Sequence, residues 1–402
     1  MSHTAETSAL PAAHRDLPMI ARRRARLATM ALFFIAGMLY ASWGVHVPTV
    51  RDKFGLNAAW LSVALFSLTG GSIATMTVNG KWIARVGTRR ACLAGGLLMT
   101  VCTALILVAP SYWLLLPVLM LFGAGMATVD VAMNAEASAV EAVLGRPIMS
   151  SLHGMFSIGG MAGAALAGLL LSLGISPALH LALVALAGTI VLFVACPATL
   201  PPVPHDTHAA SGHHGSNRWR SPVLWALGAI ALIALVAEGA MYDWASVYMR
   251  DVAHATPAFS SAGYAAFSAA MAAGRFAGDA VRARFGAVQL VLVSASVACV
   301  GMIGALLLPF PFTALAGFAL MGIGLANMMP VMFAAAMRVK GVHAAEGLAH
   351  VAGVAYVGLL LGPVMIGGIA QVTNLQIGLS VVALCAALVA LIGPRVLKRL
   401  NV

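Results

Sequence analysis

The sequence predicts an all-α membrane protein with twelve transmembrane helices and both termini in the cytoplasm. Hydrophobic residues make up 61% of the 402, and charged residues make up only 9%. The mean hydropathy is +0.96. Segments of about 20 apolar residues recur along the chain, and each is long enough to cross a hydrocarbon core of roughly 30 Å as a helix. The basic residues, which gather on one side of these spans, give the orientation.

The twelve spans fall into two groups of six, separated by one long polar segment. We expect the spans near 27–50, 57–82, 90–109, 112–140, 147–173, 177–197, 221–250, 258–282, 287–308, 310–338, 345–371 and 376–395. Residues 198–220 are rich in Pro and His, and prolines cannot continue a helix, so this segment is predicted to be a cytoplasmic linker. The expected domains are a tail 1–26, a six-helix half 27–197, the linker 198–220, a second half 221–396 and a tail 397–402.

The formal net charge of +11 has a topological explanation. With both termini inside, the 23 Lys and Arg residues divide into 20 on the cytoplasmic side, Arg275 among them, and 3 outside. Basic residues are retained in cytoplasmic loops, so the charge does not indicate a nucleic-acid partner. The polar start and the arginines before the first span predict a retained helix in the cell inner membrane. The linker histidines have no neighbouring cysteine and no carboxylate except Asp206, so no metal or cofactor is expected.

Short motifs repeat between the two halves. The repeated pairs are Gly37–Tyr40 with Gly239–Tyr242, Arg51-Asp52 with Arg250-Asp251, and Gly123–Gly125 with Gly322–Gly324, at offsets of 199 to 202. Parallel repeats of six helices are a transporter architecture. Gly154, Gly159 and Gly163 also have the small-residue spacing that lets membrane helices approach closely.

The loop between the second and third spans carries a family resemblance. Its sequence Gly80–Arg90 recurs in the other half as Gly278–Gly286. Both copies look like the loop signature of the major facilitator superfamily, and the resemblance covers essentially the whole chain. The resemblance implies a cytoplasmic gate formed by Gly80, Arg85, Gly87, Arg89, Asp279, Arg282, Arg284 and Gly286. The usual aspartate is replaced by Ala84 and Ala283, so Asp279 or Glu141 is expected to latch the gate instead.

A second pair of motifs indicates a narrower branch. Asp130–Asn134 together with Ser151–Ser157 resembles the YbjJ-like branch of the superfamily, which is distantly similar to fucose permease. That branch does not carry a known substrate.

Asp130 is the first candidate for proton coupling. A carboxylate that faces lipid costs about 2.5–3.5 kcal/mol on insertion scales, so Asp130 should face an aqueous cavity or a partner. Burial disfavours its charged form, which would let it load and release a proton as its exposure alternates. Two alternatives remain: a structural carboxylate capped by Thr128 or Asn134, and a direct substrate contact.

Glu238 and His153 are the other candidates for proton coupling. Glu238 lies near the middle of the seventh span and shares a helix face with Tyr242, whereas Asp243 is turned away and is expected to face outward water. The unperturbed pKa of a histidine is about 6.5. His153 is therefore expected to be either a proton relay or a neutral histidine hydrogen-bonded to Asn134 or Asp130.

In this architecture the first, fourth, seventh and tenth spans line a central cavity with its site near the midplane. The residues expected to bind substrate there are Tyr40, Trp43, Asn134, Tyr242 and Asn327. Aromatic residues at such a site can stack on a sugar ring, although Trp also anchors helix ends at the membrane interface. His46 lies toward the outer end of its helix and is expected to meet water.

The predicted function is secondary active transport of a small polar solute, sugar-like or organic, by alternating access coupled to protons. One alternative is a proton-driven exporter of amphipathic compounds, which the methionines of the tenth span would suit. Another is a membrane sensor that binds without transporting. The chain contains no GxSxG, HExxH or phosphate-loop motif, so an enzyme is not expected. The expected partners are the solute, protons and the lipid bilayer, and the expected state is a monomer.

Overall fold

A computed structural model describes residues 17–146, 148–201, 219, 221–339, 341–342 and 344–400, except the side chains at 279, 344 and 345. This part of the chain contains twelve α-helices, one short 3-10 helix and no strand. The helices are α2 (Met19–Phe54), α3 (Ala58–Val86), α4 (Thr88–Leu105), α5 (Tyr112–Leu144), α6 (Met149–Ser172), α7 (Pro177–Ala195), η1 (Cys196–Ala198), α8 (Pro222–Asp251), α9 (Pro257–Leu307), α10 (Pro311–Leu325), α11 (Met328–Ala336), α12 (Ala344–Val372) and α13 (Leu375–Arg399).

The predicted all-helical membrane fold is confirmed. Ten helices or helix segments of the described chain are long and apolar enough to cross a membrane. The eighth and ninth predicted spans are both within α9, which changes direction at Gly286, where φ is 78° and ψ is 163°. The tenth predicted span is divided into α10 and α11 by a break at Ala326 and Asn327. Most of the predicted linker 198–220 lies outside the described residues.

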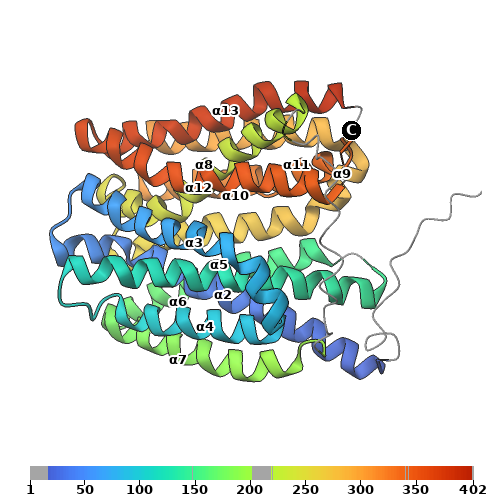
Figure 1. Ribbon diagram of the computed structural model, residues 1–402. Helices are drawn as coiled ribbons and strands as arrows, with labels where there is room; N and C mark the ends of the chain where they lie inside the picture. The colour runs from blue at the N-terminus through green and yellow to red at the C-terminus, as the bar shows by residue number, and fades with distance from the viewer. Residues whose placement is uncertain are drawn as a thin grey trace, which may run out of the picture.

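The helices form one bundle with two groups (Figure 1). Helices α2–α7, the N-terminal group, occupy the lower part of the view, and α8–α13, the C-terminal group, the upper part. The start of α2 and the end of α13 lie at the same end of the bundle, called here the terminal end; the other is the distal end. The two groups meet where α6 contacts α9, α3 contacts α12 and α2 contacts α8.

Short polar residues begin six of the twelve α-helices. Their side-chain oxygens accept the otherwise unpaired backbone N–H three residues later, which satisfies one donor of the first turn. The capping residues are Asn57, Ser111, Ser176, Ser221, Thr256 and Asn374. In α7, α8 and α9 a proline follows the cap, where its missing N–H costs nothing.

Glycines allow two helix pairs of the N-terminal group to touch backbone to backbone. A Cβ at Gly159 of α6 would lie 1.9 Å from Phe34 O of α2, and one at Gly37 would lie 2.0 Å from Phe156 O. Gly123 of α5 has the same relation to α3, with a Cβ only 1.9 Å from Leu68 O. Any side chain at these positions would collide with backbone, so the glycines fix how closely the helices pack.

Candidate functional site

Asp130 lies at a contact between the two groups of helices. Asn134 donates its side-chain N–H to Asp130 Oδ1 at 3.1 Å and to the Asp130 carbonyl oxygen at 2.8 Å. The hydroxyl of Tyr356, on α12, donates to Asp130 Oδ2 at 3.3 Å. Thr128 donates instead to Asn79 Oδ1 at 3.2 Å. The expected cap by Asn134 is therefore present, and Asp130 also joins α5 to the C-terminal group.

Glu238 forms an ion pair inside the bundle. Its Oε1 lies 3.1 Å from Nη2 of Arg275 on α9, and the two side chains are only 11% and 13% exposed. The Tyr242 hydroxyl donates to the same oxygen at 3.4 Å. The position of Arg275 corrects the sequence analysis, which counted it among the cytoplasmic basic residues. A charge at this depth is tolerated because Glu238, near the middle of α8, neutralises it.

Arg275 also contacts the N-terminal group. Its Nη1 donates to Ser157 Oγ at 2.9 Å and to the His153 carbonyl oxygen at 3.3 Å, both on α6. One guanidinium thus connects α8, α9 and α6, using its fixed fork of donors. Asp130 therefore bonds directly across the two groups, whereas Glu238 is connected to the N-terminal group only through Arg275.

Aromatic rings surround these acids. Tyr40 of α2 stacks on Phe122 with ring centroids 6.4 Å apart, and meets Tyr242 edge-on at 5.8 Å. Tyr242 in turn contacts Tyr264 at 5.5 Å and Phe267 at 5.2 Å. The two tyrosines chosen from the sequence are therefore brought together across the two groups.

The remaining candidate residues have other neighbours. The ring of His153 packs edge-on against Phe33 at 5.3 Å, and within the described chain it forms no hydrogen bond with Asp130 or Asn134. Asn327 donates to the Gly274 carbonyl oxygen at 2.9 Å, which fastens the break between α10 and α11 to α9. Trp43 is completely buried.

Two predictions about exposure were wrong. His46, expected to meet water, is completely buried, and its Nε2 lies 2.8 Å from Nδ1 of His180 on α7. Asp243, expected to face outward water, is only 7% exposed. Their positions along the helices were predicted correctly, but neighbouring helices cover both side chains.

Two ion pairs join the groups at the distal end. Arg51 at the end of α2 pairs with Asp251 at the end of α8, with Nη2 of the arginine 2.8 Å from Oδ1 of the aspartate. Arg250 pairs with Asp52 in the opposite sense. We call these four residues the distal latch, because they hold the ends of α2 and α8 together. The sequence showed the repeated Arg-Asp motif but not that its two copies pair with each other.

The predicted cytoplasmic gate lies at the terminal end. Gly87 and Gly286, with φ of 84° and 78°, are joints between consecutive helical segments, a conformation that favours glycine. Gly80 is exposed, and Arg284 lies 5.3 Å from the Phe285 ring. Among described side chains the four candidate arginines, Arg85, Arg89, Arg282 and Arg284, form no ion pair.

The side chain of only one of the two acids proposed to latch this gate is described. Glu141 accepts the backbone N–H groups of Ile148 and Met149 at 2.7 and 3.0 Å, so it caps α6. The side chain of Asp279 lies outside the described part. The gate role of these residues remains a prediction.

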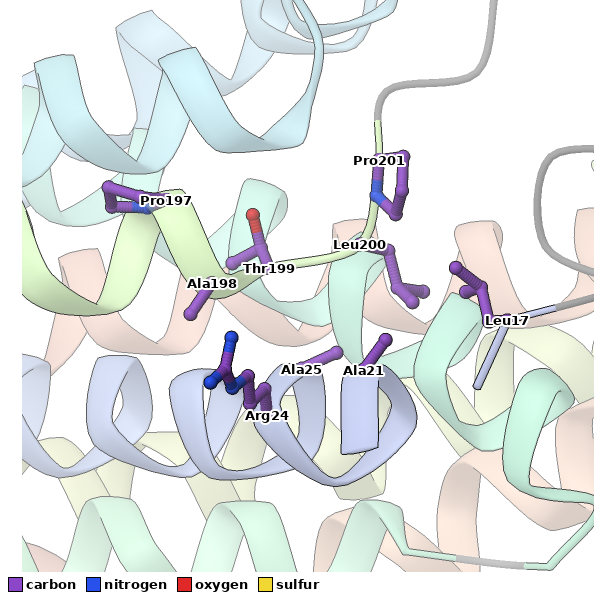
Figure 2. Close-up of a pocket in the computed structure, with 9 residues that line it drawn as sticks. All are labelled: Leu17, Ala21, Arg24, Ala25, Pro197, Ala198, Thr199, Leu200 and Pro201. Carbon is purple, nitrogen blue, oxygen red and sulfur yellow. The ribbon is translucent and has the colours of Figure 1, made fainter. Parts of the chain in front are cut away.

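A cavity of about 370 Å³ lies at the terminal end, beside the exit of the chain from η1 (Figure 2). Figure 2 shows Arg24 rising from α2 toward Ala198 and Thr199. Glu136, which sequence reasoning passed over, holds this region together, since it accepts from Thr88 Oγ1 at 2.8 Å and from the Leu200 N–H at 2.7 Å. None of the residues proposed to bind substrate lines this cavity.

A bundle of membrane-crossing helices with buried acids between two groups has the features of a membrane transporter, and comparison with known proteins agrees. Residues 30–344 match the profile of the Major Facilitator Superfamily. The chain is 33% identical over 368 residues to an uncharacterized MFS-type transporter of Yersinia pestis, covering 91% of this chain and 94% of that protein. It is 32% identical over 361 residues to the membrane protein MosC of Rhizobium meliloti, covering 88% and 87%. The chain therefore belongs to the Major Facilitator Superfamily.

Solved structures show the same fold. A variant of the nucleoside transporter NupG superposes with a TM-score of 0.75 at 12% identity, covering 91% of this chain and 98% of that one. A bacterial homolog of the human lysosomal transporter Spinster, inward-facing and unoccupied, gives a TM-score of 0.72 at 15% identity, covering 96% and 98%. At these identities the likeness concerns the fold.

Proposed function

We propose that this transporter moves a small polar solute across the inner membrane by alternating access, coupled to protons. The observation that carries the proposal is the position of Arg275, which pairs with Glu238 and also bonds to α6 of the other group. The charge state of one carboxyl group is thereby linked to the contact between the parts that must move. Alternating access in this architecture is a rocking of one group against the other.

Protonation of Asp130 changes a bond between the groups, and protonation of Glu238 changes the ion pair that positions Arg275 against α6. An ionised Glu238 neutralises Arg275, whereas a protonated Glu238 leaves the guanidinium unpaired and weakens its fixed position. An ionised Asp130 accepts from Asn134 and Tyr356. A protonated Asp130 becomes a donor at one oxygen and loses one of these bonds. Proton binding therefore loosens the contacts that hold this conformation.

The surroundings of Glu238 contain one cation and several tyrosines. Arg275 and Tyr242 bond to it directly. Tyr40, Tyr264 and Tyr356 lie close enough to interact with its charge. Arg275 is the only cation among these described neighbours, so it is the group whose charge balances an ionised Glu238.

We further propose that the chain arose from two equivalent halves with both termini in the cytoplasm. Gly87 and Gly286, 199 positions apart, have nearly the same backbone angles, with ψ of 156° and 163°. Arg51-Asp52 and Arg250-Asp251 pair reciprocally. Both support the duplication. In this orientation the distal latch closes the outer side.

The proposed solute is polar and carries a ring or flat face. Tyr40, which is partly exposed, meets Tyr242 edge-on beside Glu238, and such a pair of rings suits a sugar-like molecule or a nucleoside. This agrees with the YbjJ-like, fucose-permease-like resemblance and with the nucleoside transporter among similar folds. Export of amphipathic compounds is less favoured, because two of the three methionines that suggested it, Met328 and Met332, are buried in the core, and only Met329 is partly exposed.

A thermal-shift screen of the purified protein tests this function. The library holds sugars, polyols, nucleosides, organic and amino acids and cationic drugs, each at two pH values. A ligand at 100 times its dissociation constant should stabilise the protein by about 2.7 kcal/mol. We expect a hit among small polar solutes whose pH dependence disappears in Glu238→Gln but persists in Tyr248→Phe, a control on the same helix. Hits confined to amphipathic compounds would contradict the proposal.

A further inference from the structure

The contact between α6 and α9 carries polar groups along its length. Four residues of α9, Ser261, Tyr264, Ser268 and Arg275, recur at the three- and four-residue spacing that defines one helix face. Three glycine and serine positions of α6 meet them. A Cβ at Gly168 would lie 2.6 Å from Ser261 Oγ, a Cβ at Gly160 would lie 3.2 Å from Ser268 Oγ, and Ser157 bonds to Arg275. We call this contact the α6–α9 seam.

Two hydroxyl groups in the middle of the seam have no partner. Tyr264 and Ser268 are 0% and 1% exposed, and within the described chain neither Tyr264 OH nor Ser268 Oγ forms a hydrogen bond. An unmade buried hydrogen bond costs about 1–3 kcal/mol, and hydrocarbon supplies no replacement. Gly160 packs beside both residues: a Cβ there would lie 3.2 Å from Ser268 Oγ and 3.5 Å from Cε1 of the Tyr264 ring. Both hydroxyls therefore keep an unused hydrogen-bond donor inside the seam.

At the distal end the seam opens into a cleft of about 480 Å³. The cleft is lined by Ala165, Gly168, Leu169, Ser172, Thr256, Ala258, Phe259, Ser261, Ala262 and Ala265. Ser172 is the last residue of α6, and Thr256 is the cap of α9. One end of the cleft therefore lies where α6 ends and α9 begins.

At its inner end the seam reaches Glu238. The Tyr264 ring contacts the Tyr242 ring at 5.5 Å, and the Tyr242 hydroxyl donates to Glu238 at 3.4 Å. Arg275, the last polar residue of the seam, holds the same carboxylate. Polar groups thus recur from the distal cleft, past the two unpartnered hydroxyls, to the acid.

We propose that the α6–α9 seam is the route by which protons reach Glu238 from the distal side. Water enters the cleft and fills the gaps between the hydroxyls of Ser261, Tyr264 and Ser268. Each hydroxyl oxygen accepts a proton from one neighbour and passes its own to the next, so the hydroxyls are unchanged. One proton leaves bulk water and one is added to a carboxylate oxygen of Glu238, which ends the ion pair with Arg275. The route rests on the proposed function, in which Glu238 takes up the proton.

The test measures proton arrival directly. The full-length protein is reconstituted in liposomes, and the pH is lowered rapidly. Time-resolved infrared spectroscopy then follows the carboxyl stretching band of Glu238. The band is assigned to Glu238 because the variant Glu238→Gln lacks it. We expect Ser268→Ala and Tyr264→Phe each to slow the appearance of this band by at least about tenfold, because each removes one relay group. Ala165→Phe, in the lining of the cleft, should slow it as well.

Matched controls separate the route from general disturbance. Ser260→Ala removes another buried hydroxyl of α9, one bonded to Pro257 O, and Tyr248→Phe removes a tyrosine hydroxyl elsewhere; both should keep the original rate. Ser268→Thr retains a hydroxyl and should behave as the unmodified protein. Unchanged rates in all the seam variants would overturn the route and leave the proposed function intact. If no Glu238 band changes between the two pH values, Glu238 binds no proton and both fail.

Discussion

Replacement of Arg275 by leucine is expected to destabilise the protein by about 3–5 kcal/mol at neutral pH, because it leaves the charge of Glu238 buried without a partner. Both side chains are nearly nine-tenths buried, so water screens the pair poorly. The loss should shrink as the pH falls, since a protonated Glu238 carries no charge and needs no cation. The loss of stability is measured by unfolding the protein in mixed detergent at several pH values and following tryptophan fluorescence.

Removing both charges provides the control for this prediction. The double variant Arg275→Leu with Glu238→Gln should recover most of the lost stability, because no unpaired charge remains. Arg284→Leu, at an exposed arginine of the terminal end, should change stability by less than about 0.5 kcal/mol. If Arg275→Leu is as stable as the unmodified protein at every pH, the buried ion pair does not contribute to stability.

The second large effect is expected at Gly159. An alanine there would place its Cβ 1.9 Å from the carbonyl oxygen of Phe34, a backbone atom that no side-chain rotation can move away. Overpacking of this kind costs about 1–3 kcal/mol and occasionally more, and here α2 and α6 must separate along their length. We expect Gly159→Ala to lower the thermal midpoint and the yield of folded protein.

Gly70→Ala is the matched control, because a Cβ at Gly70 of α3 would meet nothing within 4 Å. It makes the same chemical change in a membrane helix and should leave the midpoint unchanged or slightly raised, since alanine favours helix more than glycine does. Equal effects of the two substitutions would mean that the close approach of α2 and α6 is not what requires glycine at 159.

The fold could be predicted from sequence because its signals are local. Each span is a run of apolar residues, and the small-residue spacing in α6 indicated a close contact before any neighbour was known. Gly159 is an example: its spacing from Gly163 implied a close contact between helices, and Gly159 makes such a contact with the backbone of α2. Where one span ends in a glycine joint, as at Gly286, the boundary was also visible in the sequence.

The partners of charged residues could not be predicted in the same way. Arg275 was counted with loop residues because other basic residues follow it on the way to Gly286. The presence of Glu238 in mid-span was the available signal, because a buried acid needs a cation. The exposure predicted for His46 and Asp243 was wrong for a related reason. Whether a side chain is buried depends on the neighbouring helices, and the sequence of one span does not reveal these. The identity of His180 as the partner of His46 followed only from the arrangement of α2 and α7.

The central claim is that proton binding at Glu238 alters the contact between the two groups of helices. It is tested by spin labels at Leu173 and His254, two exposed distal positions on different groups, with pulsed electron resonance measuring their separation in liposomes at two pH values. We predict that a longer separation becomes populated as the pH falls, and that Glu238→Gln shows it already at the higher pH. Identical distance distributions at both pH values, in both proteins, would contradict the account.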